Sequence, residues 1–91
     1  MSNILEQADQ IVNHRSEEKE RMYGPFAESM ERMKNIFNAM TGLDLKTEHM
    51  YQAMIALKLS RESYNHKEDN LLDCVAYIGA MNNHIENQDL S

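Results

Sequence analysis

Apolar residues recur along most of the chain at the three- and four-residue spacing that is typical of amphipathic helices. This pattern predicts four helices, over residues 3–22, 25–40, 47–64 and 67–86. No stretch alternates apolar and polar residues as a half-buried strand does. The chain has only one proline and three glycines, so few residues would interrupt these helices. We therefore expect an all-α protein, a four-helix unit in which residues 1–91 form a single domain.

The first predicted helix has a weak point. Its apolar stripe begins at Ile4 but then meets Arg15 and Lys19, which are unusual on a core face. Ser16 also has the character of a helix N-cap. The segment is therefore either one helix or two pieces with a break near residues 13–16.

The second predicted helix carries a methionine-rich seam at alternating steps of four and three: Phe26, Met30, Met33, Phe37 and Met40. Such a seam is suited to packing against another helix, and a flexible binding surface is the alternative. A chain of 91 residues forms only a marginal core. Its single cysteine, Cys74, excludes an internal disulfide and is best interpreted as a small buried hydrophobe. Of the other stabilisers that small domains use, a metal or a partner subunit, self-association is the most natural, so we expect a homodimer or a higher homo-oligomer.

Composition narrows the range of partners. The formal net charge of −6 argues against DNA or RNA binding, which needs a basic surface. No window approaches the roughly 18 apolar residues of a membrane span, and the N-terminus lacks the features of a signal peptide. We expect a protein of the reducing cytoplasm that contacts neither nucleic acid nor membrane.

Polar residues fall on faces of the last two helices that are predicted to be buried. On the third helix the residues expected to face inward are Met50, Ala53, Leu57 and Tyr64. Arg61 lies inside that face and Lys58 lies on its flank. Asn70, Asp73 and Tyr77 are spaced by three and four, so they share one ridge of the fourth helix. The short connection at 65–67 makes these helices antiparallel, so the two polar groups can face each other.

Two interpretations of these residues are open. In the first, Arg61 pairs with Asp73 or Asp69, and the group is a structural ion-pair network. In the second, Lys58 and Arg61 hold a ligand phosphate, Asn70 and Tyr77 contact its base or sugar, and Asp73 orients a cation. The second interpretation defines six candidate ligand-binding residues: Tyr23, Lys58, Arg61, Asn70, Asp73 and Tyr77.

Carboxylates on the first and last helices form a candidate metal site. Glu17 and Glu20 are three residues apart, and Asp69 and Asp73 are four apart. Facing pairs of carboxylates could hold Mg²⁺, which prefers oxygen ligands. The alternative is that the glutamates form a solvated helix face. The four histidines show no i, i+4 pairing, so a zinc site is not expected, and no motif identifies a catalytic residue.

Three pieces of sequence resemble a largely uncharacterised family of small helical proteins from phages and prophages. They are Tyr23-Gly24-Pro25, then Leu57-Lys58-x-x-Arg61, then Lys67-x-Asp69-Asn70-x-x-Asp73-x-x-x-Tyr77, and the likeness covers residues 15–77. The resemblance implies a viral origin and a shared site.

The order of parts is also similar to that of the MazG-like all-α nucleotide pyrophosphohydrolases and dimeric dUTPases. Those enzymes bind Mg²⁺ through an E-E-x-x-E element and a later E-x-x-D element. Here Arg21 follows Glu17-Glu18 where the third acid belongs, and Asn70 replaces the first acid of the second element. The resemblance implies a nucleotide-shaped pocket with an incomplete metal motif.

These observations lead to three hypotheses. The leading one is a phage-encoded nucleotide-binding protein of the host cytoplasm that sequesters a phosphorylated small molecule, such as a host immune nucleotide signal, and needs no cofactor. The second is a Mg²⁺-dependent enzyme that hydrolyses a nucleoside triphosphate, with Glu17, Glu20, Asp69 and Asp73 as metal ligands. The third is a helical inhibitor of a host protein, which would use the 4–12 stripe or the methionine-rich helix.

Overall fold

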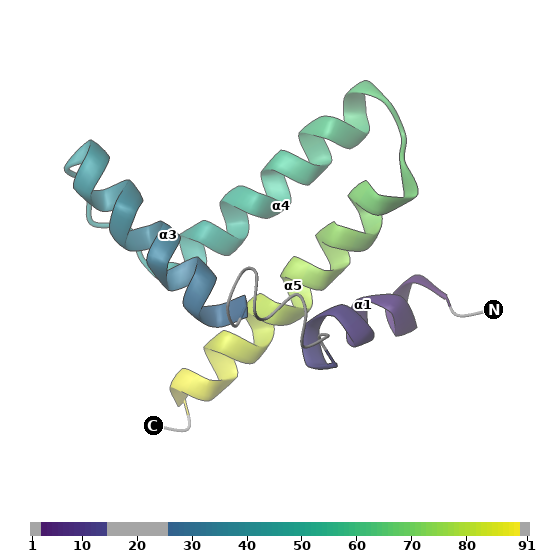
Figure 1. Cartoon of the computed structure of the whole chain (residues 1–91), viewed down its shortest axis with the longest axis horizontal. Helices are drawn as coiled ribbons and strands as arrows, with labels where there is room; N and C mark the ends of the chain where they lie inside the picture. Colours follow the sequence, from purple (N-terminus) through teal and green to yellow (C-terminus); the bar gives the residue numbers. More distant parts are fainter. Residues whose placement is uncertain (1–2, 15–25, 90–91) are drawn as a thin grey trace.

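The computed structural model describes residues 3–14 and 26–89. This part of the chain forms four helices and no strand (Figure 1). The helices are α1 (Ile4–Asn13), α3 (Phe26–Thr41), α4 (Thr47–Tyr64) and α5 (Glu68–Asp89). The all-α class is therefore confirmed. None of these helices is both long enough and apolar enough to cross a membrane.

Local hydrogen bonds explain the bounds of α1. The side chain of Asn3 caps its N-terminus, because Oδ1 accepts a hydrogen bond from the backbone N–H of Glu6 at 2.9 Å. The helix ends at Asn13, at the point where the sequence allowed a break. The rest of the predicted 3–22 segment, from residue 15 onward, lies outside the described residues.

The loop between α3 and α4 is held by one asparagine. Gly42 follows α3 with a φ of 74°, the left-handed conformation that commonly ends a helix. The side chain of Asn38 then bonds both backbone groups of Leu45: Nδ2 donates to the carbonyl at 3.0 Å, and Oδ1 accepts from the N–H at 2.9 Å. This clamp sets the position at which α4 begins relative to α3.

The helices pack around a small core. α4 packs along α5, α1 also packs on α5, and α3 meets the first half of α4 (Figure 1). The buried cluster consists of Met30, Met50, Tyr51 and Ala80. Within residues 3–14 and 26–89, only Met50 and Tyr51 bury a large side chain almost completely. Cys74 is buried as predicted.

The inward face of α4 differs from the prediction. Met50 is buried, but Ala53, Leu57 and Tyr64 are exposed, and Tyr64 is 94% exposed. The buried or half-buried residues of α4 beyond Met50 are instead Tyr51, Met54, Ile55, Lys58 and Glu62. This face is rotated by about one residue, or 100°, from the predicted one. The error arose because α4 carries apolar residues around most of its circumference, so periodicity did not select one side.

Candidate functional site

The turn between α4 and α5 forms a concavity of about 600 Å³. Its walls come from the last turn of α4, the turn itself and the first turn of α5, and we call it the α4–α5 concavity. Its lining residues are Ser60, Arg61, Tyr64, Asn65, Lys67 and Asn70. Arg61 and Lys67 bring two positive charges to these walls, and neither forms an ion pair with another described residue.

Glu62 holds this turn together. Its Oε1 accepts hydrogen bonds from the backbone N–H of Lys67 at 3.0 Å and from Nδ2 of Asn70 at 3.4 Å, and its Oε2 contacts Nδ1 of His66. The amide of Asn70 is buried and also reaches the carbonyl of Asn65 at 3.5 Å. The Glu62 carboxylate therefore fixes one wall of the α4–α5 concavity.

These contacts set the ionisation of Glu62. The hydrogen bond with His66 lowers the pKa of the carboxyl most, and the Lys67 N–H and Asn70 lower it further. Burial opposes them in part. Glu62 was not among the residues predicted from the sequence, although a Glu and a His four residues apart at a helix end are a visible signal.

A second polar contact joins α4 and α5 at Lys58 and Asp73. Lys58 Nζ lies 2.9 Å from Asp73 Oδ2, and the two side chains are 16% and 35% exposed. An ion pair between the helices was one of the two open interpretations, but with Arg61 as the cation. Arg61 is exposed because the inward face of α4 is rotated, and Lys58 takes the position that faces α5.

Tyr77 lies on the core side of α5. It is half-buried and packs against the buried cluster. It also neighbours Tyr51, whose pKa is raised by burial and, to a smaller extent, by Tyr77. Tyr77 therefore does not line the α4–α5 concavity.

The six predicted ligand-binding residues thus divide into separate groups. Arg61 and Asn70 lie together in the α4–α5 concavity, whereas Lys58 and Asp73 bind each other. Tyr77 supports the core, and Tyr23 lies outside the described residues. Four wall residues were not predicted from the sequence: Ser60, Tyr64, Asn65 and Lys67. Lys67 was nevertheless part of the motif that carried the resemblance.

Comparison with known protein families matches residues 3–85 to a domain of unknown function (DUF6378). The chain belongs to the DUF6378 family. The match includes all of the α4–α5 concavity and the Lys58–Asp73 pair. No curated protein and no solved structure matches the chain.

The carboxylates predicted to bind a metal are not assembled in the described part of this DUF6378 domain. Asp69 is exposed, Asp73 is paired with Lys58, and Glu17 and Glu20 lie outside the described residues. Within residues 3–14 and 26–89, no three His, Cys, Asp or Glu side chains are grouped closely enough to hold a metal ion.

Another polar cluster of the DUF6378 domain lies near the core. His84 Nε2 lies 3.1 Å from Glu48 Oε1, and the His84 ring is tilted against Tyr51 with their centroids 5.8 Å apart. Both side chains are about four-fifths covered, and their contact ties the start of α4 to the second half of α5. It belongs to the packing of the helices, since none of its residues lines the α4–α5 concavity.

Proposed function

We propose that this DUF6378 protein binds a small phosphorylated molecule, a nucleotide, in the α4–α5 concavity. The observation that carries the proposal is the presence of Arg61 and Lys67 on its walls without an ion-pairing carboxylate among the described residues. Guanidinium groups bind phosphate oxygens through two parallel hydrogen bonds, and lysines bind them as point charges.

Two further wall residues suit the rest of a nucleotide. Tyr64 is almost fully exposed at the rim, and aromatic stacking on a base contributes about 1–3 kcal/mol. Asn70 brings an amide that Glu62 holds in one orientation. The volume of about 600 Å³ lies within the range of small-molecule sites. These features support a ligand with a phosphate at one end and a planar ring at the other.

We propose retention of the nucleotide, not hydrolysis. Hydrolysis in the resembling pyrophosphohydrolases needs a set of metal-binding acids. Here Asn70 replaces one of those acids, and Asp73 is held by Lys58 at 2.9 Å. A carboxylate in a close ion pair is a poorer ligand for Mg²⁺, because the lysine must first be displaced. Both features support a binding protein over an enzyme.

The resemblance to phage and prophage proteins favours a class of ligand. A phage-encoded protein in the cytoplasm of its host would gain from sequestering a nucleotide that signals infection. We therefore propose a host immune nucleotide as the ligand. We also propose that the protein acts as a homo-oligomer.

The test is to incubate the purified protein and Mg²⁺ with deoxynucleotides, cyclic dinucleotides and cyclic ADP-ribose isomers. The protein is separated by filtration and denatured, and both fractions are chromatographed. We expect one intact nucleotide in the denatured fraction. Conversion to a shorter product would overturn retention and show an enzyme, and the absence of any retained nucleotide would overturn the binding proposal.

Variants connect the result to the α4–α5 concavity. Arg61→Ala and Lys67→Ala should each reduce nucleotide retention at least tenfold, because each removes a donor to the phosphate. The matched control is Lys46→Ala, since Lys46 is an exposed lysine that also directly precedes a helix but does not line the concavity. If Lys46→Ala reduced retention as much as Lys67→Ala, the ligand would not bind in this concavity.

A further inference from the structure

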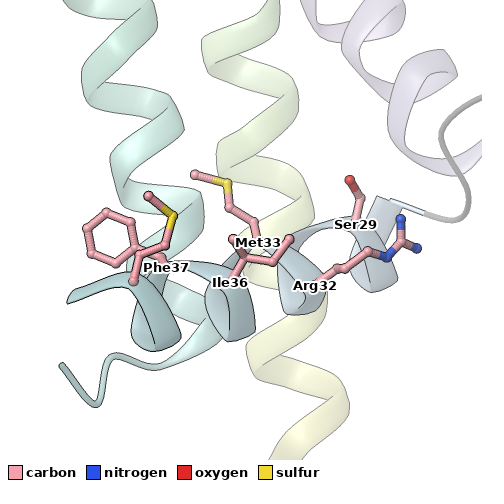
Figure 2. Close-up of a pocket in the computed structure, with 6 residues that line it drawn as sticks. Ser29, Arg32, Met33, Ile36 and Phe37 are labelled. Carbon is pink, nitrogen blue, oxygen red and sulfur yellow. The ribbon is translucent and has the colours of Figure 1, made fainter. Parts of the chain in front are cut away.

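One side of α3 exposes a continuous apolar stripe. We call Met33, Ile36, Phe37 and Met40 the α3 stripe; their spacing of three, one and three places them on one side of the helix. Ile36 is 56% exposed, Phe37 is 37% exposed and Met40 is 78% exposed. Figure 2 shows Met33, Ile36 and Phe37 side by side along α3, with Ser29 and Arg32 nearer its N-terminal end.

The stripe lines a shallow groove of about 330 Å³. Two polar residues, Ser29 and Arg32, complete its lining at one end. Leu43, which follows the other end of α3, is also exposed. Soluble monomers rarely leave this many large apolar side chains together in water, and a contiguous patch of this kind marks an interaction surface.

The core explains why a second copy is the occupant to expect. Among the described residues only Met50 and Tyr51 are large side chains with almost no exposure, which is little for a domain of this size. Met33 packs on the buried cluster and also lines the groove. Apolar side chains seated on the α3 stripe would therefore extend the existing core across the interface.

The charges at the two ends of the stripe are complementary under a two-fold axis. Arg32 is exposed near one end, and Asp44 is exposed just beyond the other. In a two-fold interface, residue i meets residue j of the partner and j meets i. If two stripes pack antiparallel about Ile36 and Phe37, each Arg32 approaches the Asp44 of the other copy.

We infer that the α3 stripe is the self-association surface of this protein and packs antiparallel against the same stripe of a second copy. This inference gives the proposed homo-oligomer a specific interface, and it does not depend on the nucleotide. A protein that binds no nucleotide but still associates through α3 would leave this inference intact. A monomer that binds a nucleotide would overturn this inference and the proposed homo-oligomer, but would leave the nucleotide-binding proposal intact.

The test is sedimentation equilibrium of the full chain. The wild type should have at least twice the mass of the monomer. Ile36→Glu and Met40→Glu should each weaken association about a hundredfold or more, because each buries an unpaired carboxylate in the interface. Circular dichroism should show that both variants remain helical; because both side chains are largely exposed in the single chain, the monomer is expected to tolerate the change.

The matched control is Leu59→Glu, since Leu59 is 49% exposed on α4 and lies away from the stripe. Leu59→Glu should associate as the wild type does. The inference would be overturned if the wild type were monomeric, if Ile36→Glu associated as the wild type does, or if Leu59→Glu dissociated as much as Ile36→Glu. A different protein bound at α3 would then be the alternative occupant.

A charge exchange tests the antiparallel arrangement. Arg32→Asp and Asp44→Arg should each weaken association several-fold, and the double variant should recover most of the loss. If the double variant were weaker than both single variants, the antiparallel arrangement would be overturned.

Discussion

The ion pair between Lys58 and Asp73 should contribute measurably to stability, and Lys58→Met tests this. The substitution keeps the apolar stem of the side chain but leaves the Asp73 carboxylate without its cation. The distance of 2.9 Å and exposures of 16% and 35% place the pair between surface and interior. Exposed pairs contribute about 0.2–1 kcal/mol, and breaking a buried pair costs about 3–5 kcal/mol.

Partial hydration decides where this pair falls between those limits. Asp73 keeps about a third of its side-chain surface in contact with water, so the unpaired carboxylate can be partly solvated. We therefore expect Lys58→Met to lower the free energy of unfolding by about 1–2 kcal/mol. For a chain of this length, that loss corresponds to a decrease in Tm of about 5–15 °C.

The assay is urea denaturation at pH 7 and one fixed protein concentration, because self-association would add to the apparent stability. Lys46→Met is the control, since Lys46 is exposed and forms no ion pair with another described residue. A double-mutant cycle with Asp73→Asn should give a coupling energy of about 1 kcal/mol. If Lys58→Met lowered the free energy of unfolding no more than Lys46→Met does, the proposed contribution of the ion pair would be refuted.

Three other substitutions test the turn, the loop and the core. Contacts with His66 and Asn70 lower the folded-state pKa of Glu62 below its ordinary 4.5. The ionised carboxylate therefore stabilises the fold above pH 4.5, and this contribution is lost as the pH falls through the lowered pKa. The stability difference between the wild type and Glu62→Gln should therefore shrink in acid urea titrations, and a difference that grew would contradict the assignment. Gly42→Ala should cost about 1 kcal/mol in urea denaturation, because φ is 74° and an added Cβ would meet no atom within 4 Å, so only backbone strain acts. Met50→Ala should cost about 2–5 kcal/mol in the same assay, because Met50 is 2% exposed; a loss below 1 kcal/mol would mean that it is not part of a packed core.

Local signals were sufficient to predict where α3, α4 and α5 lie. α4 has the bounds expected from the sequence, Thr47–Tyr64, and α5 begins at Glu68, one residue from the expected start. Gly42 marks the end of α3 because its left-handed conformation suits glycine. Helix ends depend on caps, turns and glycine, and these are properties of a few adjacent residues.

The side of α4 that faces the core was not predictable in the same way. Leu57 and Leu59 are apolar but exposed, whereas Lys58, which lies between them, is half-buried against α5. The packing of α4 against α3 and α5 decides this orientation, so it cannot be predicted from the sequence of α4 alone. A rotation of about 100° is one residue along the sequence, yet it moves Arg61 from the core to solvent.

This rotation also changes what the polar residues can do together. With Arg61 inward, the sequence suggested one site in which cations and acids faced each other across the helix pair. In the structure, Asp73 is occupied by Lys58, and Glu62 is occupied by His66, Lys67 and Asn70. Glu62 and Asp73 are thereby engaged within the fold. Arg61 and the Lys67 side chain consequently form no ion pair with a described carboxylate. This local excess of positive charge supports an anionic ligand, although the net charge of the chain is −6.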